Sequence, residues 1–213
     1  LKPRINHFKY DGPNKYPTRE EDGVITIDSY SNTQGGKKYG SKAAAYIGDR
    51  NKFKVTGRLF GRPKEKDELH GQVMLAAEYC GIKAYYEHTA DDYLGYFRER
   101  GRIRYLGRYP LGLIDPVTIK KAGPDGPERF FGTPITPFSL TKQNDNGIAY
   151  FEHHVDLIDF IEILEKAPRY DPYNRTESDD IVSFLINISV MMEPIRKAKP
   201  PKEPLVKSYD NSN

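Results

Sequence analysis

The sequence has only one cysteine, Cys80, among its 213 residues. A single cysteine cannot form a disulfide within the chain, so a disulfide-stabilised fold is excluded and a reducing compartment is expected. The sequence also lacks any run of 18 or more apolar residues, so we do not expect a membrane-spanning helix. Charge of one sign is not in large excess either, because 33 basic and 30 acidic residues leave a net charge of +3. The distribution of charge is therefore more informative than its total.

Several catalytic motifs are missing as well. There is no Gly-x-Ser-x-Gly sequence, and the pair His153-His154 has no cysteine or acid at the spacing of a zinc site. The segment GGKKYGSK (35–42) has the glycine spacing of a phosphate-binding loop. In it, however, Ser-Lys replaces the required Lys-Ser, and we expect a strand rather than a helix to follow. The sequence thus favours neither a serine hydrolase nor a zinc or nucleotide site.

The first part of the chain has the hydrophobic alternation of β-strands. Residues 24–31, 42–49 and 53–61 are predicted strands, and their short connections predict an antiparallel meander. Residues 1–22 show no periodicity and are predicted to be a linker or arm. The proline-rich, basic segment 194–213 is predicted to be a disordered tail.

The pattern then changes to the spacing of a helix. A run after Pro63 places five apolar residues on one face, and Gly81 follows as a C-terminal cap; the five are Leu69, Val73, Ala76, Ala77 and Cys80. Residues 82–89 are a predicted fourth strand, parallel to an inner strand because a helix precedes it. A short helix containing Leu94 and Phe97 should follow, ending at Gly101.

The remaining segments complete a recognisable order of elements. We predict a fifth strand at 102–109 and helices at 157–166 and 178–192. Residues 110–152, rich in glycine and proline, are predicted to be an insertion outside the core, with FFGTPI and GIAYFEHH as arms of a β-hairpin. Three antiparallel strands, then helix and strand in alternation, then a final helix, is the order of an RNase H-like α/β domain, here spanning 23–193.

Four acidic residues are candidates for a site in such a domain. Asp28 lies within the first strand, Glu87 ends the fourth, and Asp179 and Asp180 open the last helix. Each also has a structural explanation: Asp28 and Glu87 as ordinary polar strand residues, and the Asp179-Asp180 pair as part of a capping box that begins at Thr176.

Taken together, these acids predict a metal centre. The first and fourth strands are adjacent in the expected sheet and the last helix crosses them, so the acids would converge. Carboxylates about 5 Å apart repel by roughly 3 kcal/mol at an effective dielectric near 20, so such a cluster needs a cation. Oxygen ligands select Mg²⁺ or Mn²⁺, and two such ions suit phosphodiester hydrolysis.

Basic residues form three clusters along the chain. One contains Arg98, Arg100, Arg102, Arg104 and Arg108; another contains Lys37, Lys38 and Lys42; the third runs from Arg196 to Lys207. Any one cluster is explained by a solvated surface. Around an acidic site, they would favour contact with DNA phosphates, with Lys37, Lys38, Lys42, Arg102, Arg104 and Arg108 as the expected contacts.

The sequence resembles the nuclease domain of phage terminase large subunits over residues 24–192. ITIDSY, AYYEHT and SDDIVSFL are similar to the three acidic motifs of this family, and FGRPKEKDELHGQVMLAAEYCGIKAYYEHT is the most specific run. The resemblance implies that Asp28, Glu87 and Asp179 are catalytic and hold metal, with Asp180 as a helper or substitute. It also implies an auxiliary hairpin at 128–152 that approaches DNA.

The resemblance further implies an endonuclease that cuts concatemeric double-stranded DNA during viral genome packaging in the host cytoplasm. A terminase ATPase domain, a small terminase and a portal would be its partners. No ATPase domain is present, and the chain begins with Leu1, so we expect a piece of a longer protein or a separate chain. Two alternatives remain: another RNase H-like enzyme, of the resolvase or transposase type, and a non-catalytic DNA-binding or docking module.

Overall fold

The computed structural model of the protein describes residues 22–28, 43–61, 65–87, 93–122, 130–172 and 179–193. The predicted arm at 1–22, apart from Asp22, and the predicted tail at 194–213 lie outside these ranges. None of the helices in the described ranges is both long enough and apolar enough to cross a membrane.

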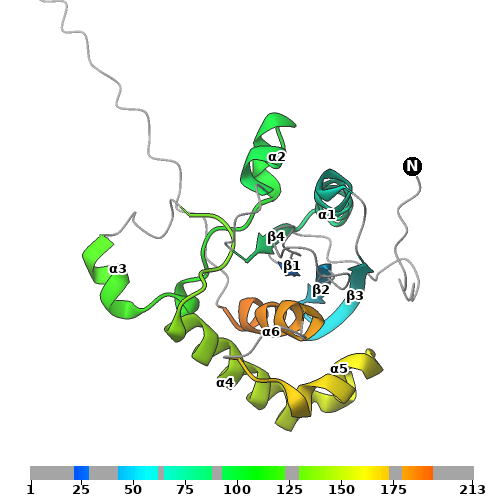
Figure 1. Ribbon diagram of the computed structural model, residues 1–213, viewed down its shortest axis with the longest axis vertical. Coiled ribbons are helices and arrows are strands. Elements are labelled where there is room, and N and C mark those ends of the chain that lie inside the picture. The colour runs from blue at the N-terminus through cyan, green and yellow to red at the C-terminus, as the bar shows by residue number, and fades with distance from the viewer. Residues whose placement is uncertain are drawn as a thin grey trace, which may run out of the picture.

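A four-stranded mixed sheet forms the centre of the fold (Figure 1). Its strands are β1 (Gly23–Asp28), β2 (Ala43–Asp49), β3 (Lys54–Gly61) and β4 (Lys83–Tyr86), in the order β3-β2-β1-β4. The pairs β1–β2 and β2–β3 are antiparallel and β1–β4 is parallel. This confirms the predicted meander and the predicted position of the fourth strand beside the first.

One face of the sheet is covered by α1 (Lys66–Cys80) and α2 (Tyr93–Glu99). The five apolar residues predicted to share a face of α1 are all buried, and they pack in one core with Ile25 and Ile27 of β1. Gly81 ends α1 in the left-handed conformation, at φ 66°, and its N–H bonds to the last turn of the helix. The helical spacing of apolar residues therefore predicted this layer well.

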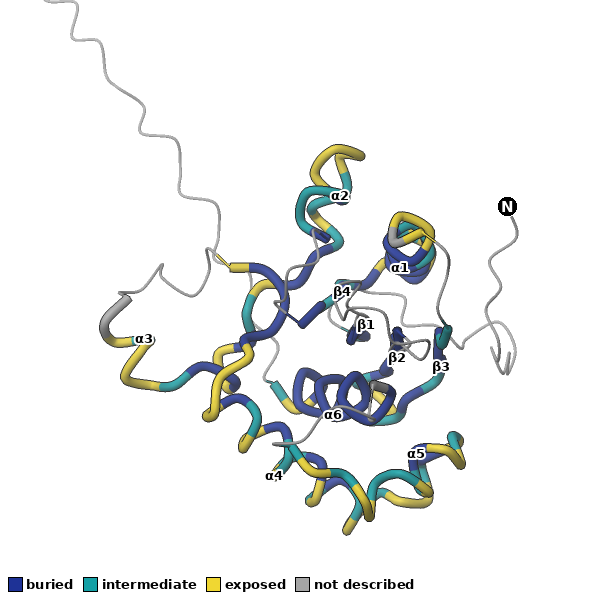
Figure 2. Tube along the Cα trace, in the orientation of Figure 1, coloured by how far each residue is buried: buried dark blue, intermediate teal, exposed yellow. Residues whose placement is uncertain are grey.

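The opposite face is covered by α6 (Asp179–Met192), which is buried along nearly its whole length (Figure 2). It is buried on all sides because α4 (Pro137–His154) and α5 (Ile161–Lys166) lie against its outer side. A helix with water on one side would need a polar stripe, whereas Ile181 to Val190 are all inaccessible. The protein thus has a mixed α/β architecture with helices on both faces of the sheet.

Two predictions about the middle of the chain are wrong. The segment predicted as a fifth strand, 102–109, contains a 3-10 turn, η1 (Ile103–Tyr105), and only single bridges at Leu106 and Arg108. The local hydrogen bonds of η1 satisfy backbone groups that a strand would pair with β4. The predicted β-hairpin is also absent from the described residues, because GIAYFEHH forms the second half of α4.

The prediction that 110–152 lies outside the core is wrong as well. Tyr150 is fully buried against Phe184, and Phe131 belongs to the core on the α1 side. The segment also contains η2 (Leu111–Leu113) and α3 (Pro116–Ala122), and η4 (Val155–Leu157) and η5 (Ala167–Arg169) follow later in the chain. The described parts of this segment, 110–122 and 130–152, are therefore part of the folded body.

Candidate functional site

Asp28 and Glu87 stand at the carboxyl ends of two neighbouring parallel strands. Ile27 of β1 is in register with Tyr86 of β4, and the Glu87 N–H donates to the Ile27 carbonyl at 3.1 Å. Continuing this register by one residue sets Asp28 opposite Glu87, on strands about 4.8 Å apart. Both side chains are buried, at 9% and 5% exposure. Ligand sites of open α/β sheets gather at this end of the strands.

The alternation of strand residues places both acids on the face covered by α6. Thr26, two residues before Asp28, exchanges hydrogen bonds with Ser183 of α6 at 2.8 and 2.9 Å. Tyr85, two residues before Glu87, packs against the same core as α6. Because side chains two residues apart share a face of a strand, Asp28 and Glu87 follow the same direction.

Helix α6 runs antiparallel to β1, so it begins at the end of the sheet where the two acids lie. Its first half meets β1 at Ser183, and its last turn lies beside Arg50, which donates to two carbonyl oxygens at 3.0 and 2.7 Å. Four helix residues advance about 6 Å and two strand residues about 6.6 Å. Position 179, four residues before Ser183, is therefore level with Asp28, two residues after Thr26.

The second acid of α6, Asp180, has two cationic partners. Its Oδ2 is 2.6 Å from Nη2 of Arg58 on β3, and its Oδ1 is 2.6 Å from Nζ of Lys166 on α5. Its side chain is 2% exposed. Both carboxylate oxygens are therefore engaged within the protein. Arg58 and Lys166 were not among the predicted site residues, and they lie 122 and 14 positions from Asp180 along the chain.

No group of three or more His, Cys, Asp or Glu side chains among the described residues is placed to hold a metal ion. The side chain of Asp179 lies outside what the structure describes. Of the three predicted catalytic acids, only Asp28 and Glu87 therefore have described side chains. The predicted three-acid centre stays a prediction. Asp28 and Glu87 supply hard oxygen donors at one end of the sheet, which is the donor type that Mg²⁺ and Mn²⁺ prefer.

The segment FFGTPI (130–135), which was predicted as one arm of a β-hairpin, borders Glu87. Thr133 bridges Glu87, its N–H donates to the Tyr86 carbonyl at 2.7 Å, and its side chain is fully buried. Gly132, at φ 89°, donates to the Gly107 carbonyl at 2.9 Å. In the sequence, Gly132 is the residue that marks this contact. Only a residue without a Cβ fits against the Tyr86 carbonyl.

The members of the arginine cluster differ in their contacts. Arg102 Nε forms an ion pair with Glu78 of α1 at 2.9 Å. Arg104 is exposed, donates to the Tyr105 hydroxyl at 3.0 Å and stacks on that ring. Arg108 is also exposed and lies over the Phe131 ring, 3.9 Å from its centre. A guanidinium that lies on an aromatic ring, as that of Arg104 does, can still donate from its edge to a phosphate oxygen.

Cys80 offers no alternative chemistry. The side chain is 3% exposed, and burial raises the pKa of its thiol to about 11. A thiol that stays protonated and buried at neutral pH is a poor nucleophile. This agrees with the interpretation of Cys80 as a core residue.

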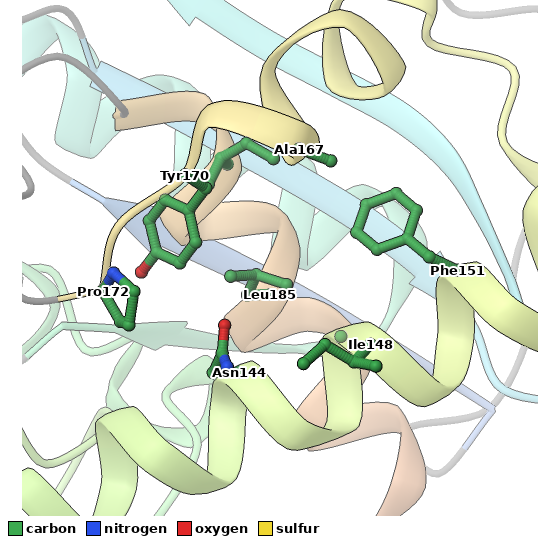
Figure 3. Close-up of a pocket in the computed structure, with 9 residues that line it drawn as sticks. Asn144, Ile148, Phe151, Ala167, Tyr170, Pro172 and Leu185 are labelled. Atoms are coloured by element: carbon green, nitrogen blue, oxygen red, sulfur yellow. The ribbon is translucent and has the colours of Figure 1, made fainter.

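A cavity of about 300 Å³ lies away from the acids, between α4, α6 and the segment after α5 (Figure 3). Its walls include Ile148, Phe151 and Leu185, with Asn144 and Tyr170 as polar groups. None of its lining residues is acidic, basic, His or Cys. The lining of the cavity therefore includes no carboxylate, imidazole or thiol that would hold a metal ion.

Several predicted contact residues lie outside the described residues. They are Lys37, Lys38 and Lys42, the segment from Arg196 to Lys207, and the proposed capping residue Thr176.

Comparison of the chain with known protein families, with curated proteins and with solved structures found no match. The fold therefore defines the protein as a mixed α/β protein with a four-stranded sheet. These comparisons do not assign the chain to a family.

Proposed function

We propose that this chain is a divalent-metal-dependent DNA endonuclease with an RNase H-like fold, of the type found in phage terminase large subunits. One observation carries the proposal. Asp28 and Glu87 end two adjacent parallel strands in register, on the face of the sheet where α6 begins level with them. The strand order β3-β2-β1-β4 and the antiparallel run of α6 support the fold assignment.

The acids have defined roles in this proposal. Asp28 and Glu87 hold Mg²⁺ or Mn²⁺ between the strand ends, and Asp179 completes the centre from the first turn of α6. Asp180 is assigned to structure rather than to metal, because Arg58 and Lys166 already engage both of its oxygens. Two ions bound there would activate a water molecule and stabilise the leaving 3′ oxygen of the phosphodiester.

The substrate in this proposal is double-stranded DNA, cut from concatemers during viral genome packaging in the host cytoplasm. Arg104 and Arg108 are exposed, and Arg108 forms a bridge with Phe131 of the segment that borders Glu87. They would contact phosphates on one side of the acids. The ATPase domain, small terminase and portal are partners that follow from the resemblance of the three acidic motifs.

The test is cleavage of supercoiled plasmid in the presence of Mn²⁺. We expect the wild type to nick it, and we expect Asp28→Asn and Glu87→Gln to lower the rate at least about 100-fold, equivalent to about 2.7 kcal/mol of transition-state stabilisation. The amide keeps the size of each side chain but removes the charge that holds the cation. The measurement is the initial rate of conversion to open-circular DNA on agarose gels.

Asp49→Asn is the matched control. Asp49 is also a buried acid in a strand, at 5% exposure, but it lies at the opposite end of the sheet and accepts from the backbone of Asn51. Full activity of Asp28→Asn would refute the proposed chemistry. Preference for branched DNA, or strand-transfer products, would identify the resolvase or transposase type instead. DNA binding without cleavage or metal binding would identify a docking module.

A further inference from the structure

The beginning of α6 is held by a partly buried network of charges, in which Arg58 and Asp180 are buried and Lys166 is partly exposed. Asp180, the second residue of the helix, accepts from Arg58 of β3 and Lys166 of α5, each at 2.6 Å. Its backbone neighbour Asp179 is the residue to which the proposed function assigns the third carboxylate. The network therefore acts on the same turn of helix as the proposed metal centre.

Arg58 is itself fixed on several sides. Its side chain is 8% exposed, its Nη1 lies 3.2 Å from Oε1 of Glu162 on α5, and its guanidinium lies 4.3 Å from the centre of the Phe60 ring. Asp180 thus cannot shift without breaking contacts to a strand and to a second helix. Arg58 and Asp180 are also far apart in the sequence, by 122 positions, so their contact links two distant segments of the chain.

Removing the charged groups of such a network from water costs free energy, so the network contributes little net stability. A buried ion pair recovers its desolvation cost only with near-ideal geometry, and packed apolar residues often stabilise as well or better. What the network supplies is a fixed orientation of one helix turn. A helix rotates about 100° per residue, so position 179 shares a face with Ser183, which contacts β1, while position 180 is directed toward β3 and α5.

We propose that Asp180 is a positioning residue, clamped by Arg58 and Lys166 so that the first turn of α6 is held beside the metal centre that contains Asp28 and Glu87. This inference rests on the proposed function. It separates two adjacent aspartates by role: Asp179 binds metal, and Asp180 orients the turn that carries it. We call Arg58, Lys166 and Asp180 the α6 clamp.

The test compares the Mn²⁺ affinity of the wild type with that of Arg58→Met and Lys166→Met, measured by electron paramagnetic resonance of free Mn²⁺. Loss of a positive charge near a cation site should by itself tighten binding. The clamp predicts the opposite: each variant raises the Mn²⁺ dissociation constant by about 10- to 100-fold, as is typical when a supporting residue of a metal ligand is lost. The plasmid nicking rate should fall in parallel.

Lys54→Met is the matched control. Lys54 also lies on β3 and pairs with a carboxylate, that of Asp159 at 2.9 Å, but it is not part of the α6 clamp. We expect its Mn²⁺ dissociation constant to stay within about twofold of the wild type, because the partly exposed pair of Lys54 and Asp159 links β3 to the segment before α5 rather than to α6 and contributes little. Lys166, at 39% exposure, tolerates substitution more easily than Arg58, so Lys166→Met decides the test if Arg58→Met fails to fold.

Two results would overturn the clamp. If Arg58→Met and Lys166→Met bind Mn²⁺ as tightly as the wild type, or more tightly, while Asp180→Asn loses binding, then Asp180 is itself a ligand. If all three variants keep wild-type affinity, the network does not act on the centre. Absence of Mn²⁺ binding by the wild type would instead overturn the proposed function together with this inference.

Discussion

At the scale of single residues, three arginines of one short segment have different surroundings. Arg102 is paired with Glu78 and ties η1 to α1, whereas Arg104 and Arg108 stack on aromatic rings and are exposed. A guanidinium that is already paired with a carboxylate has fewer donors left for phosphate. The three side chains therefore differ in what they can contribute to DNA binding.

We predict that Arg104→Gln weakens DNA binding and that Arg102→Gln does so much less. Loss of one phosphate contact should lower the slope of log K against log salt by about 0.9. The measurement is fluorescence anisotropy of a labelled duplex at several salt concentrations, with EDTA present so that cleavage does not interfere. Arg102→Gln should lower stability instead, because it breaks the contact with Glu78.

Equal losses of salt dependence in the two arginine variants would contradict this division of roles. Arg169→Gln provides a control for charge alone, because Arg169 lies in η5, whose first residue, Ala167, lines the cavity between α4 and α6. Its salt dependence should match that of the wild type.

The sequence alone could not separate Asp179 from Asp180. Both open a helix, and both fit a capping pattern or a metal site equally well. The difference lies in partners that are distant along the chain: Arg58 on β3 and Lys166 on α5. Asp28 and Glu87 were easier to place, because strand ends and strand adjacency follow from local patterns and the rule for parallel connections.

At the scale of elements, hydrophobic periodicity predicted β1 to β3, α1 and α6 close to their observed bounds. It failed for α4, where Ile148 and Tyr150 alternate with other residues as in a strand, and where Gly147 looks like a turn. Gly147 is instead helical and lies against Leu185, since a Cβ there would meet the Leu185 side chain. The capping box formed by Thr136 and Ser139 was the signal that was overlooked.

The segment next to Glu87 gives a prediction about Gly132. Gly132→Ala should lower the free energy of unfolding by about 1–2 kcal/mol for its positive φ and by about 1–3 kcal/mol more for crowding the Tyr86 carbonyl. Urea unfolding followed by circular dichroism measures both terms together.

Gly81→Ala isolates the contribution of backbone conformation. Gly81 also has a positive φ, 66°, but a Cβ there meets no atom within 4 Å. We therefore expect Gly81→Ala to cost only the conformational part, about 1–2 kcal/mol. Equal destabilisation by the two alanines would show that the close approach of Gly132 to β4 is unimportant.

At the scale of the whole molecule, both faces of the sheet are covered by apolar layers. Polar side chains that could bind a ligand are therefore expected at the ends of the strands. One face of the sheet packs against α1 and α2, and the other against α6, which α4 and α5 cover in turn (Figures 1 and 2). Two buried acids, Asp28 and Glu87, lie at the carboxyl ends of β1 and β4. The arrangement brings together β1, β4 and α6, which are distant in the sequence. Short sequence motifs could therefore predict the separate acids but not how closely they lie in the fold.

The most direct measurement is anomalous X-ray diffraction from crystals of the wild-type protein grown or soaked with Mn²⁺. The account predicts an anomalous peak between the carboxylates of Asp28 and Glu87, within about 2.0–2.6 Å of oxygen atoms, with Asp179 as a further ligand and Asp180 still bound to Arg58. Anomalous density elsewhere, or none between the strand ends at millimolar Mn²⁺, would contradict it.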